Sequence, residues 1–169
     1  LKAIAQDRAA AYSSGMTGVK ADKTLLDFRP INKTVLNARN DVVFKGVPKS
    51  QDALGTYRSI ETLIDTWQRQ PPELVNGFAH WPHRTAEGLD ALKQAIGEIR
   101  NSTEFGSLSR KVADNVYNSI KAQITKQAPE YAKTMKGYAE ASDKIKELRK
   151  TFSLGENATT DTALRKLQS

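Results

Sequence analysis

The sequence predicts an all-α protein built as an antiparallel bundle or a set of helical hairpins, with long helices that also suit an elongated shape. Apolar residues recur at helical spacing along most of the chain, and β-branched residues do not gather in short alternating runs. The hydrophobic share of 38% and the aromatic share of 7% suit thin layers of helix better than a thick core. The chain contains no cysteine, which excludes disulfides and thiolate metal sites.

Residues 1–49 are expected to form an N-terminal helical segment. An alanine-rich helix opens it, and we expect Gly15 and Gly18 to bend or fray this helix because glycine is a poor helix former. Pro30 predicts the start of a short helix that reaches about Asp41, since proline is well tolerated in the first turn. A loop then leads to the next helix.

Residues 50–153 are expected to form the antiparallel bundle itself. Ser50, Thr85 and Ser107 each offer a side-chain oxygen that can cap the start of a helix. Pro129 predicts the start of the longest helix of the chain. The connections between these helices are short, so consecutive helices should lie side by side and antiparallel.

The predicted helices carry apolar side chains on one face, at the three-and-four spacing of a stripe that is buried or faces a partner. The stripe consists of Tyr57, Ile60, Ile64, Trp67, Leu89, Leu92, Ile96, Val112, Val116, Ile120, Tyr131, Met135, Tyr138 and Ile145. Near-heptad spacing in the last helix suits a coiled coil between chains as well as packing within one chain. The stripe therefore has two open interpretations, core and partner surface.

Residues 71–84 are predicted to form an ordered loop, because consecutive prolines end the preceding helix. The loop contains Phe78 and Trp81, and the two histidines of the chain, His80 and His83, lie on either side of that tryptophan. A metal site needs three or four ligands, and the nearby acids fall on separate predicted elements. We interpret both histidines as structural or surface residues and expect no metal and no other cofactor.

No catalytic centre is expected, and the chain is interpreted as a non-enzyme. No serine lies in a strand-turn-helix nucleophile elbow. Glu73, Glu87 and Glu104 are the acids near turns or helix starts that could serve a hydrolase, but no partner residue accompanies them. No small-molecule ligand is evident either.

The net charge of +7 invites a nucleic-acid interpretation. Residues 1–100 carry 14 basic and 11 acidic groups and residues 101–169 carry 12 and 8, so the excess is spread along the chain. We therefore favour solvated helix faces, with phosphate contact as the alternative. The basic residues that would make such a contact are Arg110, Lys111, Arg149, Lys150, Arg165 and Lys166.

The ends of the chain suggest a segment excised from a longer polypeptide. The sequence begins with Leu1 and ends at Ser169 inside a predicted helix, so residues 154–169 are expected to lead into a missing remainder. The opening residues are too polar for a signal peptide. No apolar run reaches the length that spans a bilayer, and no membrane span is expected.

Several phrases of the sequence resemble those of one known protein family. The longest is Glu87–Ile99, EGLDALKQAIGEI. The other phrases are Ala11–Tyr12, Gly15–Met16, Leu26–Ile31, Val112–Ile124, Gln127–Ala132, Tyr138–Ser142, Leu154–Gly155 and Thr162–Ser169. Together they resemble large virion-associated proteins of tailed phages and prophages. The likeness spans most of the chain, which is longer than the family pattern around Val75 to Trp81.

The resemblance implies a helical segment of a long structural polypeptide of the internal virion, DNA-ejection or tail-associated type. It implies no catalytic residue, because the family pattern carries none. We therefore expect a non-catalytic assembly segment whose partners are other virion proteins or its own copies. Its expected location is the virion, or the host bacterial cytoplasm before assembly. A DNA-contacting module that assists genome packaging or ejection is the alternative.

Overall fold

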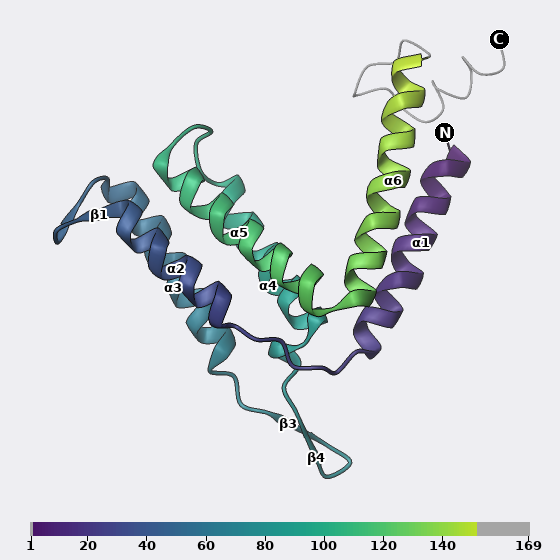
Figure 1. The fold of residues 1–169 in the computed structure, drawn as a ribbon, viewed down its shortest axis with the longest axis horizontal. Coiled ribbons are helices and arrows are strands. Elements are labelled where there is room, and N and C mark those ends of the chain that lie inside the picture. The colour runs from purple at the N-terminus through teal and green to yellow at the C-terminus, as the bar shows by residue number, and fades with distance from the viewer. Residues whose placement is uncertain (1, 152–169) are drawn as a thin grey trace. The chain divides into compact units, whose positions relative to one another are not determined.

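The computed structural model describes residues 2–151 and is built mostly of packed helices (Figure 1), which confirms the predicted all-α class. The described residues divide into two compact units. One unit joins the helices before residue 22 and after residue 128, and the other contains residues 22–128. This division differs from the predicted boundaries at residues 49 and 153, because the first and last described helices pair with each other.

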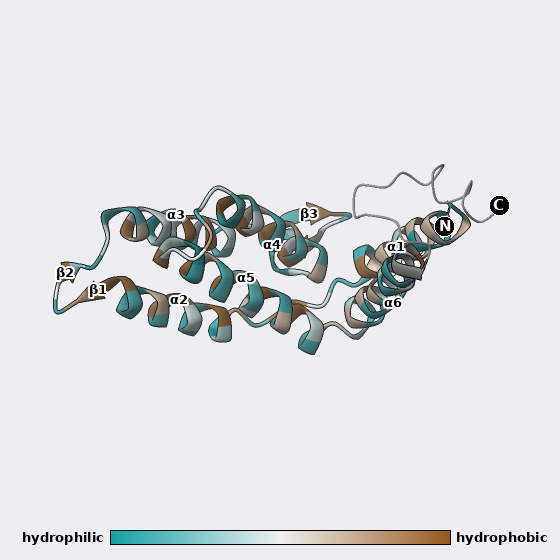
Figure 2. Cartoon of the chain, turned by 90° about the horizontal axis from the view of Figure 1, so that it is seen from above, coloured by the Kyte–Doolittle hydropathy of each residue, from teal (hydrophilic) through white to brown (hydrophobic). Residues whose placement is uncertain are grey.

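The unit of residues 22–128 is an antiparallel four-helix bundle. Its helices are α2 (Arg29–Val42), α3 (Gln51–Gln68), α4 (Ala86–Asn101) and α5 (Leu108–Gln127). Viewed from above, α2 and α5 form one layer and α3 and α4 form the other (Figure 2). Helix α5 packs against all three other helices, which makes it the centre of the bundle.

The core of this bundle is a continuous set of apolar side chains from all four helices. Helix α5 contributes Val112, Val116, Ile120 and Ile124, each completely buried. Ile31, Val42, Ile60, Leu89, Leu92 and Ile96 are completely buried as well. Each such side chain contributes roughly 1.5–3 kcal/mol relative to its exposed state. The predicted stripe therefore packs as core within residues 22–128.

All three predicted N-caps are confirmed. Ser50 accepts a hydrogen bond from the backbone N–H of Ala53 at 3.2 Å, and Thr85 accepts one from Gly88 at 3.2 Å. Ser107 accepts one from Arg110 at 3.1 Å. Each cap satisfies a backbone donor that the first turn of a helix leaves free. Helices α3, α4 and α5 accordingly begin at the next residue in each case.

Two short hairpins replace loops that the sequence pattern predicted. The strands β1 (Val43–Phe44) and β2 (Val47–Pro48) connect α2 to α3. The strands β3 (Glu73–Val75) and β4 (Phe78–His80) follow α3, and the short helix η1 (Pro82–Arg84) leads from them into α4. Both sheets are antiparallel and two-stranded, and neither contributes to the bundle core.

Both hairpins close through a two-residue turn with positive φ at each position. Asn76 and Gly77 have φ of 53° and 81°, and Lys45 and Gly46 have φ of 46° and 83°. These angles are typical of the type I′ turn, whose twist matches that of the strands on either side. Lys45 adopts a left-handed conformation that a lysine rarely takes, so the Lys45–Gly46 turn is harder to predict from sequence than the Asn76–Gly77 turn.

The beginning and end of the bundle are tied together by Gln127. Its side-chain oxygen accepts a hydrogen bond from the backbone N–H of Asp27 at 2.7 Å, and its amide nitrogen donates to the Asp27 carbonyl at 3.2 Å. The side-chain oxygen of Gln123, one helical turn earlier, accepts a hydrogen bond from the same amide nitrogen at 3.0 Å. The extended segment before α2 is thereby fixed against the last turn of α5.

The other unit is an antiparallel pair of helices, α1 (Lys2–Ala21) and α6 (Pro129–Thr151). Tyr12 packs against Tyr138 with ring centroids 5.5 Å apart, and Arg8 donates to Ser142 at 3.4 Å. Helix α1 continues through both glycines to Ala21, so it does not fray at either of them as one form of the prediction had it. Gly15 lies so close to Thr134 that any side chain there would collide with it.

The predicted stripe is less completely buried in this unit. Tyr131 is fully buried, Met135 is half-buried and the side chain of Tyr138 is 40% exposed. Trp67 in the bundle is also half-buried. The side chain of Ile145 and the predicted helix over residues 160–169 lie outside the described residues. None of the helices within residues 2–151 combines the length and apolar character needed to cross a bilayer.

Replacing Gly15 by alanine should destabilise the pair of α1 and α6. The new methyl group would lie 2.6 Å from Cγ2 of Thr134, so the helices must separate, at a cost of about 1–3 kcal/mol. Gly18→Ala is the matched control, since a methyl group there would lie 3.6 Å from the Glu130 carboxylate, an ordinary van der Waals distance. Hydrogen exchange of α1 amides measures the effect, and equal protection in both variants would contradict the close contact.

Replacing Gln127 by alanine should loosen the junction between Asp27 and α5. Both backbone groups of Asp27 lose their partner, and the expected cost is about 1–2 kcal/mol in the free energy of unfolding. Gln123→Ala removes only the supporting hydrogen bond and should cost less. Chemical denaturation of the full chain measures both, and a Gln127→Ala variant as stable as the parent would show that the junction is not held this way.

Candidate functional site

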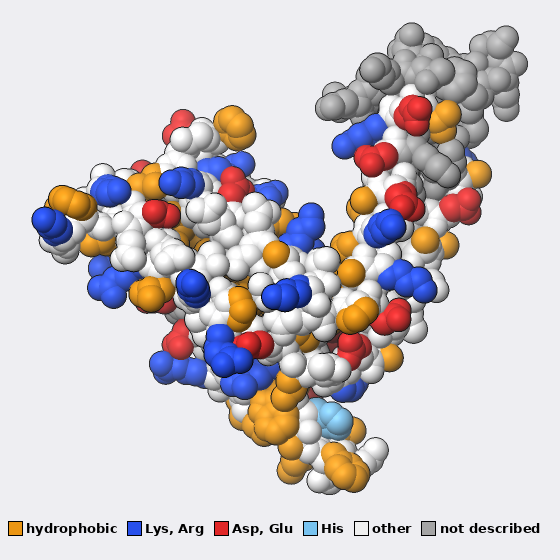
Figure 3. Space-filling model, in the orientation of Figure 1, with side chains coloured by type: hydrophobic (Ala, Val, Ile, Leu, Met, Phe, Trp, Pro, Cys, Tyr) orange, Lys and Arg blue, Asp and Glu red, His pale blue; other side chains and the backbone are white. Residues whose placement is uncertain are grey.

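Hydrophobic side chains gather along the β3–β4 hairpin, with a histidine among them (Figure 3). The side chains of Leu74, Phe78 and Val75 are 78%, 72% and 48% exposed. Large apolar side chains that gather on the surface mark sites of interaction more often than single ones do. The hairpin is therefore the leading candidate for a functional surface.

A cavity of about 470 Å³ lies at the base of the hairpin. Its volume is in the range that holds a small ligand or a few side chains of a partner. Its walls combine apolar and charged side chains, from the segment before α2, both strands of the hairpin and the start of α4. The lining residues are Lys23, Leu25, Glu73, Val75, Ala79, His80, Trp81, Pro82, Thr85 and Glu87.

The base of the hairpin is held rigidly against α3 and α4. The indole nitrogen of Trp67 donates to the carbonyl of Gly88 at 3.0 Å, and the ring of His83 meets the Trp67 ring edge-on at 5.0 Å. Arg84 donates to the carbonyl of Gln68 at 2.9 Å, which joins η1 to the end of α3. These contacts fix the point from which the strands project.

The two histidines have different surroundings. His83 is packed on Trp67 and helps to hold η1, so its role is structural, while His80 lines the cavity. The structure also brings Glu73 and Glu87 to this cavity, although they lie on separate elements. Within residues 2–151, no three His, Cys, Asp or Glu side chains are close enough to hold a metal ion.

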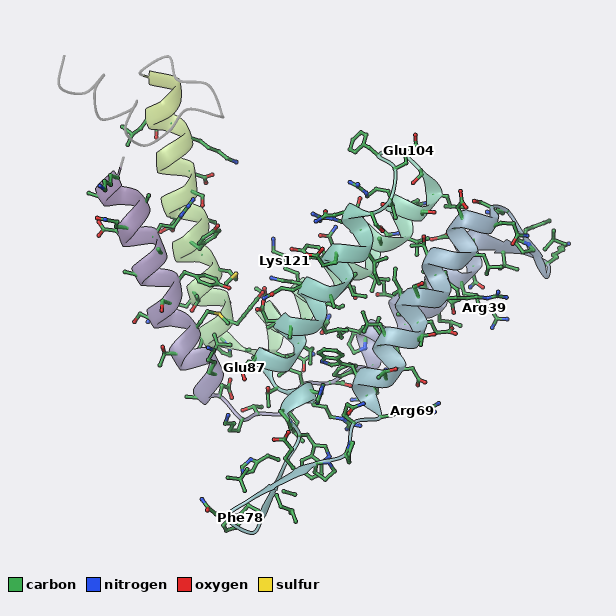
Figure 4. The ribbon with its side chains drawn as sticks, turned by 180° about the vertical axis from the view of Figure 1, so that it is seen from behind. Arg39, Arg69, Phe78, Glu87, Glu104 and Lys121 are labelled. Atoms are coloured by element: carbon green, nitrogen blue, oxygen red, sulfur yellow. The ribbon has the colours of Figure 1, made fainter. Side chains whose placement is uncertain are left out.

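The three acids considered for hydrolysis do not share one cleft, because Glu73 and Glu87 line the hairpin cavity and Glu104 does not. Glu104 lies at the end of the bundle opposite Phe78 and Glu87 (Figure 4), beside a different cavity between the start of α3 and the α4–α5 loop. Glu73 is exposed and Glu87 is half-buried. A carboxylic acid that donates a proton at neutral pH generally needs burial, which Glu73 lacks.

The most buried carboxylate, Asp90, was not singled out by the sequence pattern. Its side chain is 6% exposed and lies 3.1 Å from the ammonium of Lys93, and it accepts a hydrogen bond from Gln94 at 2.7 Å. All three residues lie on consecutive turns of α4. Lys93 neutralises the carboxylate and Gln94 donates a hydrogen bond to it within the same helix, and Asp90 lines none of the cavities described above.

A further cavity, between α2 and α3, is bordered by a tyrosine and a glutamate that satisfy each other. The Tyr57 hydroxyl donates to the Glu61 carboxylate, four residues further along α3. Burial, together with this hydrogen bond, raises the pKa of Tyr57 to about 12. A phenol with that pKa keeps its proton at neutral pH, so the pair is suited to holding α3 together more than to proton transfer.

The basic residues proposed for phosphate contact are only partly described. Arg110 donates to the hydroxyl of Thr103 at 2.7 Å and to its carbonyl at 2.8 Å, which closes the α4–α5 loop. Lys111 is exposed. Arg165 and Lys166, and the side chains of Arg149 and Lys150, lie outside the described residues.

Two exposed arginines at the end of the bundle that carries the β3–β4 hairpin form ion pairs with neighbouring acids. Arg29 lies 2.9 Å from Asp27, and Arg69 lies 3.1 Å from Asp65. The hydrogen bond from Arg29 holds the pKa of Asp27 below its usual range. These ion pairs are solvent-exposed and contribute little to stability, but each lowers the net positive charge of its surroundings.

No protein family, curated protein or solved structure matches this chain. Function is therefore inferred from the chain's own residues, among which the apolar hairpin stands out. Asn76–Gly77 between apolar residues is the strongest short-range signal for a hairpin and could have predicted these strands. Exposure of Leu74 and Phe78 depends on how the hairpin projects, which no local pattern indicates.

Replacing Trp67 by phenylalanine should loosen the base of the hairpin. The substitution keeps an aromatic ring against His83 but removes the donor to Gly88, at a cost of about 0.5–1.5 kcal/mol. Trp81→Phe, at a residue that lines the cavity but makes no such hydrogen bond to Gly88, is the control. Amide exchange across residues 82–88 should rise in the first variant, and unchanged exchange there would exclude this role for Trp67.

Proposed function

We propose that this chain is a non-catalytic assembly segment of a large virion-associated protein of tailed phages or prophages. Its task is to present a rigid helical bundle that packs against other polypeptide chains in the particle. The resemblance of sequence phrases along most of the chain supports the family, and the packed helical bundle agrees with a structural role. Its expected location is the virion, with the bacterial cytoplasm before assembly.

The observation that carries the proposal is the exposure of large apolar side chains at both ends of a bundle whose core is already full. Leu74, Val75 and Phe78 project at one end. At the other end Phe44 is 62% exposed in the β1–β2 hairpin, and Phe105 is 89% exposed in the α4–α5 loop. Such side chains gain free energy when a partner covers them, at roughly 25 cal/mol per Å².

The same geometry supports an assembly role better than a catalytic one. The ionisable side chains that line the hairpin cavity come from the segment before α2, the two strands and the first turn of α4, and among the described residues they form neither an ion site nor a buried acid pair. The other lining side chains are mostly apolar or aromatic, as in surfaces that bind other chains.

The full chain should self-associate, or bind its partner proteins, through these apolar ends. We expect sedimentation velocity and light scattering to show an average mass that rises with concentration, and the double variant Leu74→Ser, Phe78→Ser to weaken this rise. Phe105→Ser tests the opposite end separately.

Two outcomes would count against this function. One is a chain that stays monomeric at all concentrations and binds none of the proteins encoded beside it. The other is retention on duplex DNA that falls steeply between low and moderate salt, which would favour the DNA-contacting alternative, since released counterions produce that dependence.

A further inference from the structure

The β3–β4 hairpin has open edges. Within residues 2–151 no third strand pairs with β3 or β4. Val75 and Phe78 flank the two-residue turn and pair with each other, so the next pair, Leu74 with Ala79, turns its backbone N–H and C=O groups outward. Ala79 therefore presents a donor and an acceptor along the outer edge of β4.

The outer edge of β4 runs beside the cavity. Four consecutive residues, Ala79, His80, Trp81 and Pro82, line it, and Leu25 and Val75 add apolar walls. An extended polypeptide paired with Ala79 would place alternate side chains toward this cavity, because successive side chains of a strand point to opposite faces. The cavity volume of about 470 Å³ has room for one or two such side chains.

The charges around the cavity favour a basic group on the occupant. Glu73 and Glu87 line it together with Lys23, so carboxylates outnumber ammonium groups at this place, although the chain as a whole carries a net charge of +7. Glu87 lies in the first turn of α4 at the cavity rim, and Figure 4 places it at the root of the hairpin that ends in Phe78. A lysine or arginine beside an apolar side chain would match this combination.

We propose that the outer edge of β4 binds an extended segment of a partner polypeptide by strand addition, and that the segment places at the cavity an apolar side chain and, two residues away along the same face, a lysine or arginine. This inference rests on the proposed assembly function and names the surface and the chemistry of the partner. Main-chain hydrogen bonds supply affinity in this mode, and the pocket for alternate side chains supplies specificity.

The sequence around the strands favours the addition of a third strand beside β4 over addition beside β3. Pro71 and Pro72 precede β3, and since neither has a backbone N–H they limit pairing along that edge. A two-stranded hairpin is marginally stable by itself, so a third strand would also stabilise it. The contacts of Trp67 with Gly88 hold the root of the hairpin in place before a partner arrives.

The test uses the full chain and an unbiased library of random ten-residue peptides displayed on their own messenger RNA. We expect the selected peptides to alternate apolar residues and to carry lysine or arginine, and we expect binding to weaken at least about tenfold in Ala79→Pro, which loses the outward N–H. Leu74→Pro is the matched control, because it removes the corresponding group from the opposite edge and should retain binding.

Charge is tested separately from the backbone. Glu73→Gln and Glu87→Gln should each weaken a selected basic peptide several-fold, whereas Glu104→Gln, at the other end of the bundle, should not. A selected peptide methylated on the backbone nitrogens that face β4 should lose binding to the unaltered chain. This measurement holds even if Ala79→Pro perturbs the hairpin itself.

Three results would overturn the inference. They are selected peptides that bind Ala79→Pro as tightly as the parent, peptides without basic residues, and binding of anionic lipid vesicles through Leu74 and Phe78 with no peptide enriched. The two proposals fail separately. If the chain assembles but selects no peptide whose binding depends on Ala79, only the proposed β4 site is wrong. If it selects such peptides but never assembles, the proposed assembly function is wrong.

Discussion

The bundle depends on one buried row of side chains on α5. Val112, Val116, Ile120 and Ile124 follow one another at each helical turn and are fully buried because α2, α3 and α4 surround that helix. Covering this row requires two antiparallel hairpins to meet across it. The N-caps, the Gln127 junction and the Trp67 contact then set where each hairpin begins and ends.

A core completed in this way leaves the connections between helices free to do other work. The β1–β2 hairpin and the α4–α5 loop lie at one end, and the β3–β4 hairpin lies at the other. Their apolar side chains add nothing to the core, since Phe44, Phe78 and Phe105 are all largely exposed. A partner that covers them is the simplest physical reason for apolar groups at these positions.

The pair of α1 and α6 is held differently from the bundle. Its seam includes Arg8, Tyr12 and Ser142, so hydrogen bonds and ring contacts take part where the bundle uses branched aliphatic side chains. The guanidinium of Arg8 also lies 5.3 Å from the centre of the Tyr138 ring. Two helices alone bury less apolar surface than four, which is why Tyr138 is still 40% exposed.

Local sequence was sufficient for the helices and their beginnings. The spacing of Ile60, Ile64 and the α5 row, and the caps at Ser50, Thr85 and Ser107, depend on contacts within a few residues, and these were predicted correctly. The Asn76–Gly77 turn also belongs to this local level, although nearby prolines favoured a loop interpretation.

Tertiary structure alone decided which helices distant in sequence pair and which of their side chains meet. The union of α1 with α6, the cavity that gathers Glu73, His80 and Glu87, and the packing of His83 on Trp67 join residues that are separated in sequence. Periodicity shows that a face seeks cover but not which surface covers it, because apolar contact is non-directional. The exposed hairpin follows from that same choice, since the four helices fill the core and leave the hairpin outside it.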